Sequence, residues 1–198
     1  DILEEYHRRP DEYETEGLVI PKGMSIREYG ESLHERAEKG NVLILDGMGF
    51  APGMSNLTTE RGISLLDKAV AAVARVGGIP NAEAKERHPL RYLTTWSIEH
   101  VLREYNVKTW MIKDGKIIEV QALVDKENFT FNELGRNEEL ECAVTPGMPS
   151  FIYIHPELEY FAEKTVRWPG HYAGIETLIE TGMLSREPVE TKWGKIAP

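Results

Sequence analysis

The chain of 198 residues carries 23 basic and 33 acidic side chains, which give it a formal net charge of −10 at pH 7. Hydrophobic residues make up 41% of the sequence and charged residues 28%, a balance typical of globular proteins and not of disordered or fibrous ones. The negative charge argues against nucleic acid or an anionic membrane surface as the main partner, because both are bound by clusters of Lys and Arg.

Cysteine content and hydrophobic runs narrow the class further. The one cysteine, Cys142, excludes an intrachain disulfide framework and a multi-cysteine zinc site. No stretch of the sequence approaches the roughly 20 apolar residues of a membrane-spanning helix. The cysteine content fits a reducing compartment, and we therefore expect a cytoplasmic protein.

The first 40 residues are more acidic than the rest of the chain. They hold 11 acidic and 6 basic residues, so half of the net charge falls in a fifth of the length. Ser25 and Glu28 form a capping-box pattern, which predicts a helix that runs to about Lys39 and stops at Gly40. We interpret residues 1–40 as an acidic leader or linker.

The strongest strand signal in the sequence is the aliphatic run at residues 41–46. A continuous run of this kind is typical of a strand that is buried on both faces of a parallel sheet. The Gly- and Pro-rich residues 47–53 predict a tight loop, after which Ser55 or Asn56 is expected to cap a helix.

The next segment allows two interpretations. Apolar residues recur at helical spacing from Ile63 to Val73, which favours one long helix. Residues 69–76 are small or β-branched and are followed by Gly77 and Gly78, which is typical of a strand. Periodicity alone favours the helix.

The remainder of the chain predicts a polar loop, then helices and antiparallel strands. Asp114-Gly115 between two strand-like segments is the strongest short-range hairpin signal. The predicted fold class is α+β, with a mixed, largely antiparallel sheet and helices packed on it. The expected elements are a loop at residues 79–91, helices at 97–105 and 171–184, strands at 108–113, 116–123, 139–145 and 162–167, and a polar tail from residue 185.

The glycine loop after the aliphatic run raises the question of a nucleotide site. A dinucleotide fingerprint needs a third glycine, but that position is Pro52. The strand candidate at residues 69–76 ends in glycines, without the acidic residue that would bind a ribose. Three interpretations remain open: a nucleotide site, a structural turn, and a loop that faces substrate or nicotinamide.

Arg167 and His171 form the second candidate site. A Pro-Gly turn follows Arg167 and places His171 at a helix start, where the two side chains could clamp a carboxylate. The alternative is a solvated turn with a capping histidine. Lys164 lies three positions before Arg167 on the predicted strand, so the two should point to opposite faces.

The sequence shows no metal-ligand spacing among its histidines and carboxylates. Cys142 has no neighbouring base and is expected in the core. A metal site is therefore not predicted.

Four segments in order resemble the saccharopine dehydrogenase-like family, and most of all its lysine 6-dehydrogenase branch. The resemblance covers roughly residues 41–184. Its most specific parts are the Pro-Gly loop and the segment EKTVRWPGH. The segments are DGMGFAPGMSN at 46–56, VGGIP at 76–80, PLRY at 89–92 with TWS at 95–97 and EY at 104–105, and EKTVRWPGH at 163–171.

The resemblance implies an NAD- or NADP-dependent enzyme that transfers hydride to or from the CH-NH group of a lysine-type amino acid. Family members have a Rossmann domain and a second α+β domain, which binds substrate and carries homodimer contacts. The acidic residues 1–40 lack a nucleotide fingerprint and would be a remnant of, or linker to, a missing Rossmann domain, with residues 41–46 as its last strand. Residues 41–184 would be the substrate domain and 185–198 a tail. The resemblance also favours the strand at 69–76.

By position, the resemblance assigns roles to nine residues. Arg167, with Asn56 and Gly170, would bind the substrate, and Lys164 and His171 would be catalytic. The sequence departs from the family pattern at Trp168, where Tyr is more usual. The loop residues Gly47, Gly49, Pro52 and Gly53 would contact the nicotinamide.

Two hypotheses of function follow. In the first, the chain is the substrate-binding and dimerisation part of an NAD(P)-dependent amino-acid dehydrogenase of lysine metabolism, inactive on its own. In the second, it is a non-catalytic module that keeps the fold for oligomerisation or regulation. Neither hypothesis involves nucleic acid or a membrane.

Overall fold

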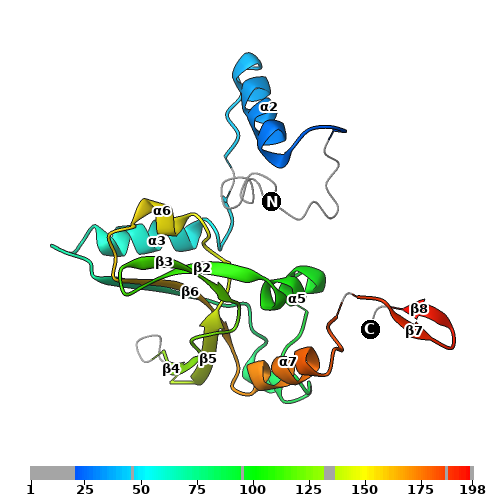
Figure 1. Ribbon diagram of the computed structural model, residues 1–198. Coiled ribbons are helices and arrows are strands. Elements are labelled where there is room, and N and C mark those ends of the chain that lie inside the picture. Colours follow the sequence, from blue (N-terminus) through cyan, green and yellow to red (C-terminus); the bar gives the residue numbers. More distant parts are fainter. Residues whose placement is uncertain (1–20, 46, 95, 132–136, 186, 197–198) are drawn as a thin grey trace. The chain divides into compact units, whose positions relative to one another are not determined.

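Two units, each with its own packing, make up the chain. The computed structural model describes residues 21–45, 47–94, 96–131, 137–185 and 187–196 (Figure 1). The first unit draws its described residues from Asp1–Ala72, Trp110–Ile118 and Gly147–Phe161, and the second from Val73–Thr109, Glu119–Pro146 and Ala162–Pro198.

A six-stranded sheet is formed in the described part of the chain, in the order β3-β2-β6-β5-β4, and β1 also pairs with β6. The pairings of β6 with β2, of β5 with β6 and of β4 with β5 are antiparallel. The predicted α+β class with a largely antiparallel sheet is confirmed. The strands are β1 (Ala71–Val76), β2 (Lys108–Lys113), β3 (Lys116–Gln121), β4 (Glu127–Thr130), β5 (Glu139–Val144) and β6 (Tyr160–Arg167).

The first described helix begins and ends where the sequence predicts. In α2 (Ile26–Lys39), Ser25 Oγ accepts a hydrogen bond from the Glu28 amide, and the Glu28 carboxylate accepts one from the Ser25 amide at 2.7 Å. Gly40 ends the helix. The capping box is thereby confirmed. The other helices are α3 (Met54–Ile63), α4 (Ala82–Lys85), α5 (Ile98–Asn106), α6 (Phe151–Ile154) and α7 (His171–Glu180).

The predicted buried strand at residues 41–46 is wrong for the described part of this segment, residues 41–45. These residues belong to no strand, and the four aliphatic side chains at 42–45 are between 54% and 80% exposed. Residue 46 lies outside the described residues. A strand of this composition is stable only between neighbouring strands, and none pairs with it in the described chain.

The segment after the glycine loop forms a helix and then a strand. Helix α3 has Gly53 as its N-cap, so the predicted caps at Ser55 and Asn56 are wrong. The helix stops at Ile63, and β1 pairs with β6, so the prediction of one long helix is wrong and the strand is confirmed. Sheet pairing outweighs the local helical pattern here.

The Asp-Gly hairpin is confirmed, whereas several shorter elements were not predicted from the sequence. Asp114 and Gly115 have φ values of 52° and 68°, the left-handed conformation that a two-residue hairpin turn requires. The tail, predicted as unpatterned, contains a small hairpin. Its strands are β7 (Val189–Thr191) and β8 (Gly194–Ile196), and the other elements not predicted are α4, α6 and β4.

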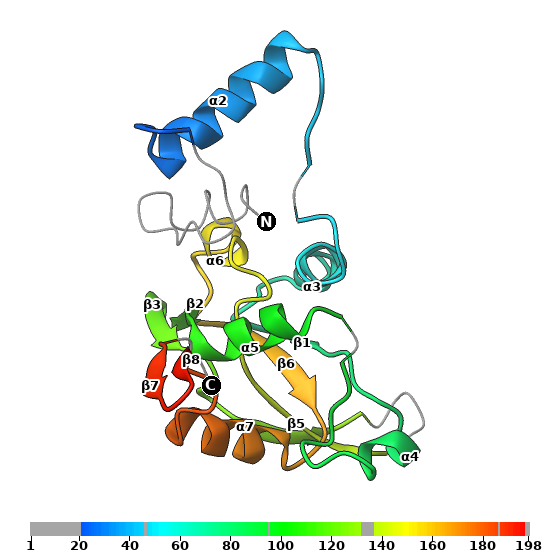
Figure 2. The same ribbon diagram turned by 90° about the vertical axis from the view of Figure 1, so that its right-hand side faces the viewer.

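The second unit has apolar clusters on both faces of its part of the sheet. Helices α5 and α7 pack together with β5 in one cluster (Figure 2). The other cluster contains Cys142, which is fully buried, as predicted. The first cluster comprises Val101, Tyr105, Ala122, Leu123, Ala143, Tyr172 and Ile175, and the second Leu140, Cys142, Val166 and Trp168.

Membrane-spanning helices are absent from the described segments. None of the helices there combines the length and the apolar character that crossing a bilayer requires.

The end of β1 lies so close to β6 that Gly77 has no room for a side chain. A Cβ atom on Gly77 would lie 2.7 Å from both the Cβ atom and the carbonyl oxygen of Val166. We expect Gly77→Ala to lower the free energy of unfolding by about 1–3 kcal/mol, because the backbone of β6 must move. Urea unfolding measures the difference.

The matched control is Gly62→Ala, at a glycine of α3 where an added Cβ meets nothing within 4 Å. This variant should be unchanged or up to about 1 kcal/mol more stable, because Ala favours a helix. Equal effects of the two substitutions would contradict the close approach of β1 to β6.

Candidate functional site

Strand β6 sends two positively charged side chains to opposite faces of the sheet. Its register with β5 pairs Lys164 with Val144 and Arg167 with Glu141. Lys164 and Arg167 are each only 3% exposed. Because they lie three positions apart on a strand, they point into different surroundings, as the sequence predicts.

The Arg167 guanidinium is held by neutral groups. Its Nε donates a hydrogen bond to the Tyr105 hydroxyl at 2.8 Å, and its Nη1 donates to the Val166 carbonyl at 2.9 Å and to the Gly78 carbonyl at 3.4 Å. The guanidinium carbon also lies 4.9 Å from the centre of the Tyr92 ring. Cation–π contact and carbonyl oxygens stabilise the charge only in part.

Arg167 has no acidic partner in the part of the chain that the structure describes. Among the residues that the structure describes, no carboxylate forms an ion pair with it, and its Nη2 donates to none of their atoms. A buried charge without a counter-ion costs several kcal/mol. The site therefore carries an uncompensated positive charge that an anion could satisfy.

His171 adjoins this charge at the first residue of α7. It is 1% exposed, its Nδ1 lies 2.8 Å from the Leu90 carbonyl oxygen, and its Nε2 lies 3.0 Å from the Tyr105 hydroxyl. Its ring also packs at 5.4 Å from the Tyr92 ring. Arg167, Tyr105 and His171 thus form one buried cluster joined by hydrogen bonds.

Burial keeps both neighbours of Arg167 neutral. It lowers the pKa of His171 to about 4, opposed by the hydrogen bond to Leu90 and reinforced by the charge of Arg167. It also raises the pKa of Tyr105 to about 12, an effect that Arg167 opposes. At pH 7 the cluster therefore has the charge of Arg167 alone.

Lys164 lies in a different environment. Its Nζ donates to the Asp125 carbonyl oxygen at 2.8 Å and forms ion pairs, each at 3.2 Å, with the carboxylates of Asp125 and Glu127. Arg75 also pairs with Glu127, at 2.7 Å. The two cations on this face are balanced by two carboxylates, and Lys164 does not share a site with Arg167.

The N-terminus of α7 already has a carboxylate. Glu141 accepts hydrogen bonds from the Gly170 amide at 3.1 Å and from the Tyr172 amide at 2.8 Å. A carboxylate in this position satisfies the free amides of the helix start and interacts favourably with its dipole. The amide of Gly170 is therefore engaged within the protein.

The glycine loop belongs to the first unit and closes on itself. The Gly49 amide donates to the Pro52 carbonyl at 2.8 Å, the Gly53 amide to Asn56 Oδ1 at 3.0 Å, and the Met54 amide to the Gly49 carbonyl at 2.9 Å. A pyrophosphate cradle needs amides that point at the ligand. The amides of Gly49, Gly53 and Met54 are used inside the loop and are not available to a phosphate.

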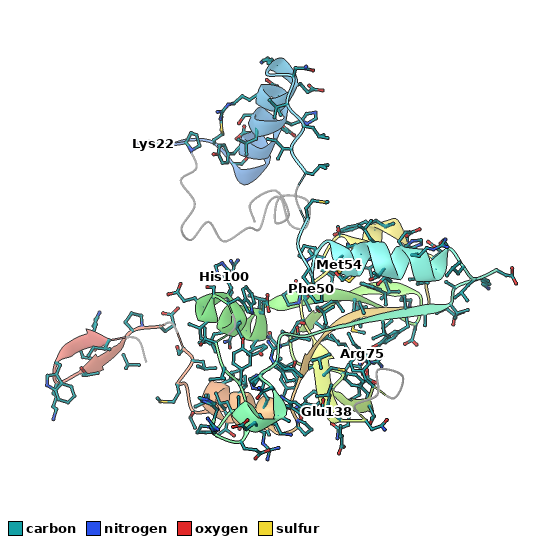
Figure 3. All side chains as sticks on the ribbon, turned by 180° about the vertical axis from the view of Figure 1, so that it is seen from behind. Lys22, Phe50, Met54, Arg75, His100 and Glu138 are labelled. Atoms are coloured by element: carbon teal, nitrogen blue, oxygen red, sulfur yellow. The ribbon has the colours of Figure 1, made fainter. Side chains whose placement is uncertain are left out.

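The outer side of this loop is apolar. Met48, Phe50 and Met54 are between 54% and 69% exposed (Figure 3). Gly47, Gly49, Pro52 and Gly53 shape the backbone beneath them, and Asn56 Oδ1 is turned back to that backbone. The exposed side of the loop is therefore apolar.

The structure brings together only part of the predicted site. Arg167, His171 and Gly170 lie together in the second unit, Lys164 is on the opposite face, and Asn56 belongs to the first unit with the loop glycines. In the segments that the structure describes, no group of three metal-ligating side chains occurs.

Sequence reasoning missed Tyr105, Tyr92 and Glu141. Tyr105 ends the predicted helix at 97–105, and both tyrosines belong to segments that carry the resemblance. An inward tyrosine needs a partner for its hydroxyl, which is a signal for Tyr105. The sequence offers no comparable signal for Glu141, whose partners lie about 30 residues away.

Comparison with known proteins places this arrangement in a family. The family model of the saccharopine dehydrogenase C-terminal domain matches residues 49–196. The chain belongs to this family.

The relatives are saccharopine dehydrogenases. The chain is 25% identical over 163 residues to "Saccharopine dehydrogenase [NADP(+), L-glutamate-forming]" of Pyricularia oryzae, covering 78% of this chain and 36% of that protein. The apo saccharopine dehydrogenase (L-Glu forming) of Saccharomyces cerevisiae shares the fold with a TM-score of 0.65 and 21% identity, over 87% of this chain and 38% of that one. The chain thus spans little more than a third of their length.

The neutral, buried state of His171 predicts a loss of stability in acid. The unfolded state binds a proton near pH 6.5 and the folded state only near pH 4, so unfolding is favoured as the pH falls between these values. From pH 7 to pH 5 we expect a loss of about 2 kcal/mol in the free energy of unfolding. His171→Asn should lack this loss.

Urea unfolding at both pH values measures the effect, and His34→Gln is the matched control. His34 has a side chain that is 73% exposed, so its removal should leave the acid sensitivity intact. Equal acid sensitivity of wild type and His171→Asn would show that His171 does not stay neutral in the folded state.

Proposed function

We propose that this chain is the amino-acid-binding part of a dehydrogenase, in which Arg167 binds a carboxylate of a lysine-type amino acid. One observation carries the proposal, namely the buried guanidinium without an acidic partner in the described chain. A carboxylate matches the planar N–H groups of Arg and is the ligand that such a site favours. Membership of the saccharopine dehydrogenase C-terminal domain family supports the choice of an amino acid.

The hydride carrier would be NAD or NADP, held mainly by parts of the enzyme outside this domain. The loop supports this division of labour, since the amides of Gly49, Gly53 and Met54 are hydrogen-bonded within it. When bound, the dinucleotide supplies hydride transfer. The chain's own contribution is to bind and orient the amino acid and to keep water from it.

Two exposed apolar features support contact with another domain. The aliphatic side chains at residues 42–45 are exposed although their pattern is that of a buried strand, and Met48, Phe50 and Met54 are exposed beside them in the sequence. We propose that these residues pack against the nucleotide-binding domain, with residues 42–45 contributing to a strand of its sheet. A homodimer remains part of the proposal.

An assay of enzymatic turnover distinguishes this proposal from the hypothesis of a non-catalytic module. The purified full-length protein is assayed with NAD and with NADP against a panel of L-lysine, L-glutamate and L-saccharopine, by absorbance of the reduced nicotinamide. Activity on any of these supports the dehydrogenase. Its absence with every combination, together with the absence of amino-acid binding, would favour the module that serves oligomerisation or regulation.

Removal of Arg167 should abolish recognition of the carboxylate. Wild type is expected to bind L-lysine more tightly than 1,5-diaminopentane, which lacks only the carboxylate. Arg167→Met should weaken binding of L-lysine about 100-fold, because it removes charge-assisted hydrogen bonds. Binding of 1,5-diaminopentane should change little, and calorimetry measures both.

The control is Arg75→Met, which removes an arginine that is paired with Glu127. Arg75 is labelled in Figure 3. This variant should leave the preference for carboxylate ligands unchanged. If Arg167→Met keeps the preference of wild type, Arg167 does not bind the carboxylate and the proposal fails.

A further inference from the structure

The Tyr105 hydroxyl lies between two buried nitrogen atoms. It is 2.8 Å from Arg167 Nε and 3.0 Å from His171 Nε2. Tyr105 is 1% exposed, so neither hydrogen bond is replaced by bulk water. A donor or acceptor left without a partner in such a place costs about 1–3 kcal/mol.

The donors in this chain can be assigned from chemistry alone. The Nε–H of arginine can only donate, so the Tyr105 oxygen accepts from Arg167 and its own proton is directed to His171 Nε2. The Leu90 carbonyl can only accept, so His171 Nδ1, at 2.8 Å, carries the ring proton. Both neighbours require the same neutral tautomer of His171.

This assignment leaves no nitrogen of His171 for a substrate. One ring nitrogen donates to Leu90 and the other accepts from Tyr105. A general acid or base needs a nitrogen within reach of the reacting atoms. The expected catalytic role of His171 therefore does not fit the geometry. Its role must instead come from the residues that it contacts.

Tyr105 and His171 hold the plane of the guanidinium. Nε is fixed by Tyr105, and Nη1 is fixed by the carbonyl oxygens of Val166 and Gly78. These three bonds use Nε and Nη1 and leave Nη2 without a partner among the described residues. A group held in this way binds a planar ligand without first losing rotational freedom.

We propose that Tyr105 and His171 are positioning residues, which aim Arg167 at a ligand carboxylate through the relay Arg167 Nε–H to Tyr105 O–H to His171 Nε2. The proposal rests on the proposed function of Arg167 as the carboxylate-binding residue. His171 acts through Tyr105 and does not touch the substrate. Because both positioning residues are neutral, the charge of Arg167 is left entirely to the ligand.

Two substitutions of His171 test its hydrogen bonds to Tyr105 and to Leu90 separately. In His171→Gln the side-chain oxygen can take the place of Nε2 and accept from Tyr105, whereas the shorter side chain of His171→Asn can replace only Nδ1 and donate to Leu90. We expect His171→Gln to stay within about twofold of wild type in affinity for L-lysine and L-glutamate, and His171→Asn to lose about tenfold. Tyr105→Phe should lose as much as His171→Asn.

The decarboxylated amine shows whether positioning is the cause. In the full-length protein, 1,5-diaminopentane should bind all three variants about as well as wild type, since only the carboxylate contact is misaligned. Adding His171→Asn to Tyr105→Phe should cause no further loss, because the two residues form one chain of hydrogen bonds. Equal loss for amino acids and for the amine, or equal loss for Gln and Asn, would overturn the proposal.

The unmodified protein provides a test that needs no variant. Side-chain 15N NMR at pH 7 should show His171 with its proton on Nδ1 and none on Nε2. The opposite tautomer would overturn the relay even if His171→Asn failed to fold. If Arg167→Met loses the preference for carboxylate ligands but His171→Asn keeps it, the proposed function of Arg167 is supported and only the relay is contradicted.

Discussion

The burial of strand β6 on both faces is the constraint on which the second unit depends. From Ala162 to Arg167 every side chain is buried, so alternate residues enter two separate environments. The strand nevertheless carries three ionisable residues, Glu163, Lys164 and Arg167. Since a buried charge without partners costs several kcal/mol, the elements around β6 have to supply polar groups at fixed places.

The two faces meet this demand in different ways. On one face Lys164 pairs with two carboxylates, and Arg75 joins the same group, so the charges cancel. On the other face Glu163 accepts a hydrogen bond from Thr145, and Arg167 contacts a hydroxyl, two carbonyl oxygens and an aromatic ring. The first arrangement is complete as it stands. On the second face, the positive charge of Arg167 has no carboxylate paired with it among the described residues. This is the arrangement expected of a binding site for an anion.

Features that depend on neighbouring residues could be predicted from the sequence. The capping box of Ser25 and Glu28 and the turn at Asp114 and Gly115 are set by atoms within a few positions, and both are confirmed. The α+β class follows from the order of such local patterns along the chain. The capping box and the hairpin turn could be predicted because neither depends on contacts with distant residues.

Features that depend on distant partners could not be predicted in this way. The aliphatic run at residues 42–45 signals a need for burial, but the pattern does not say whether the neighbouring strands belong to the described chain. In the same way, Ile63 to Val73 has a helical period that pairing with β6 overrides. The resemblance decided the second case correctly because it carries information about tertiary structure that periodicity lacks.

The candidate site shows the same division. Arg167 and His171 could be found because a Pro-Gly turn brings them close in the sequence. Tyr105 lies 62 and 66 positions from the two atoms it joins, and no spacing rule connects them. Because the sequence does not connect Tyr105 with His171, it suggests that His171 is free to act as an acid or base. In the structure both of its ring nitrogens form hydrogen bonds.

The position of Glu141 decides which positive group is left for a ligand. A helix N-terminus and a guanidinium both attract anions, and the sequence placed both at the start of α7. Glu141 takes the amides of Gly170 and Tyr172, so the helix start is already neutralised from within the sheet. Binding of an anion then falls to Arg167, whose Nη2 can donate a charge-assisted hydrogen bond to a carboxylate oxygen. A neutral His171 behind Tyr105 adds no second charge, so the site is matched to one carboxylate and not to a dianion.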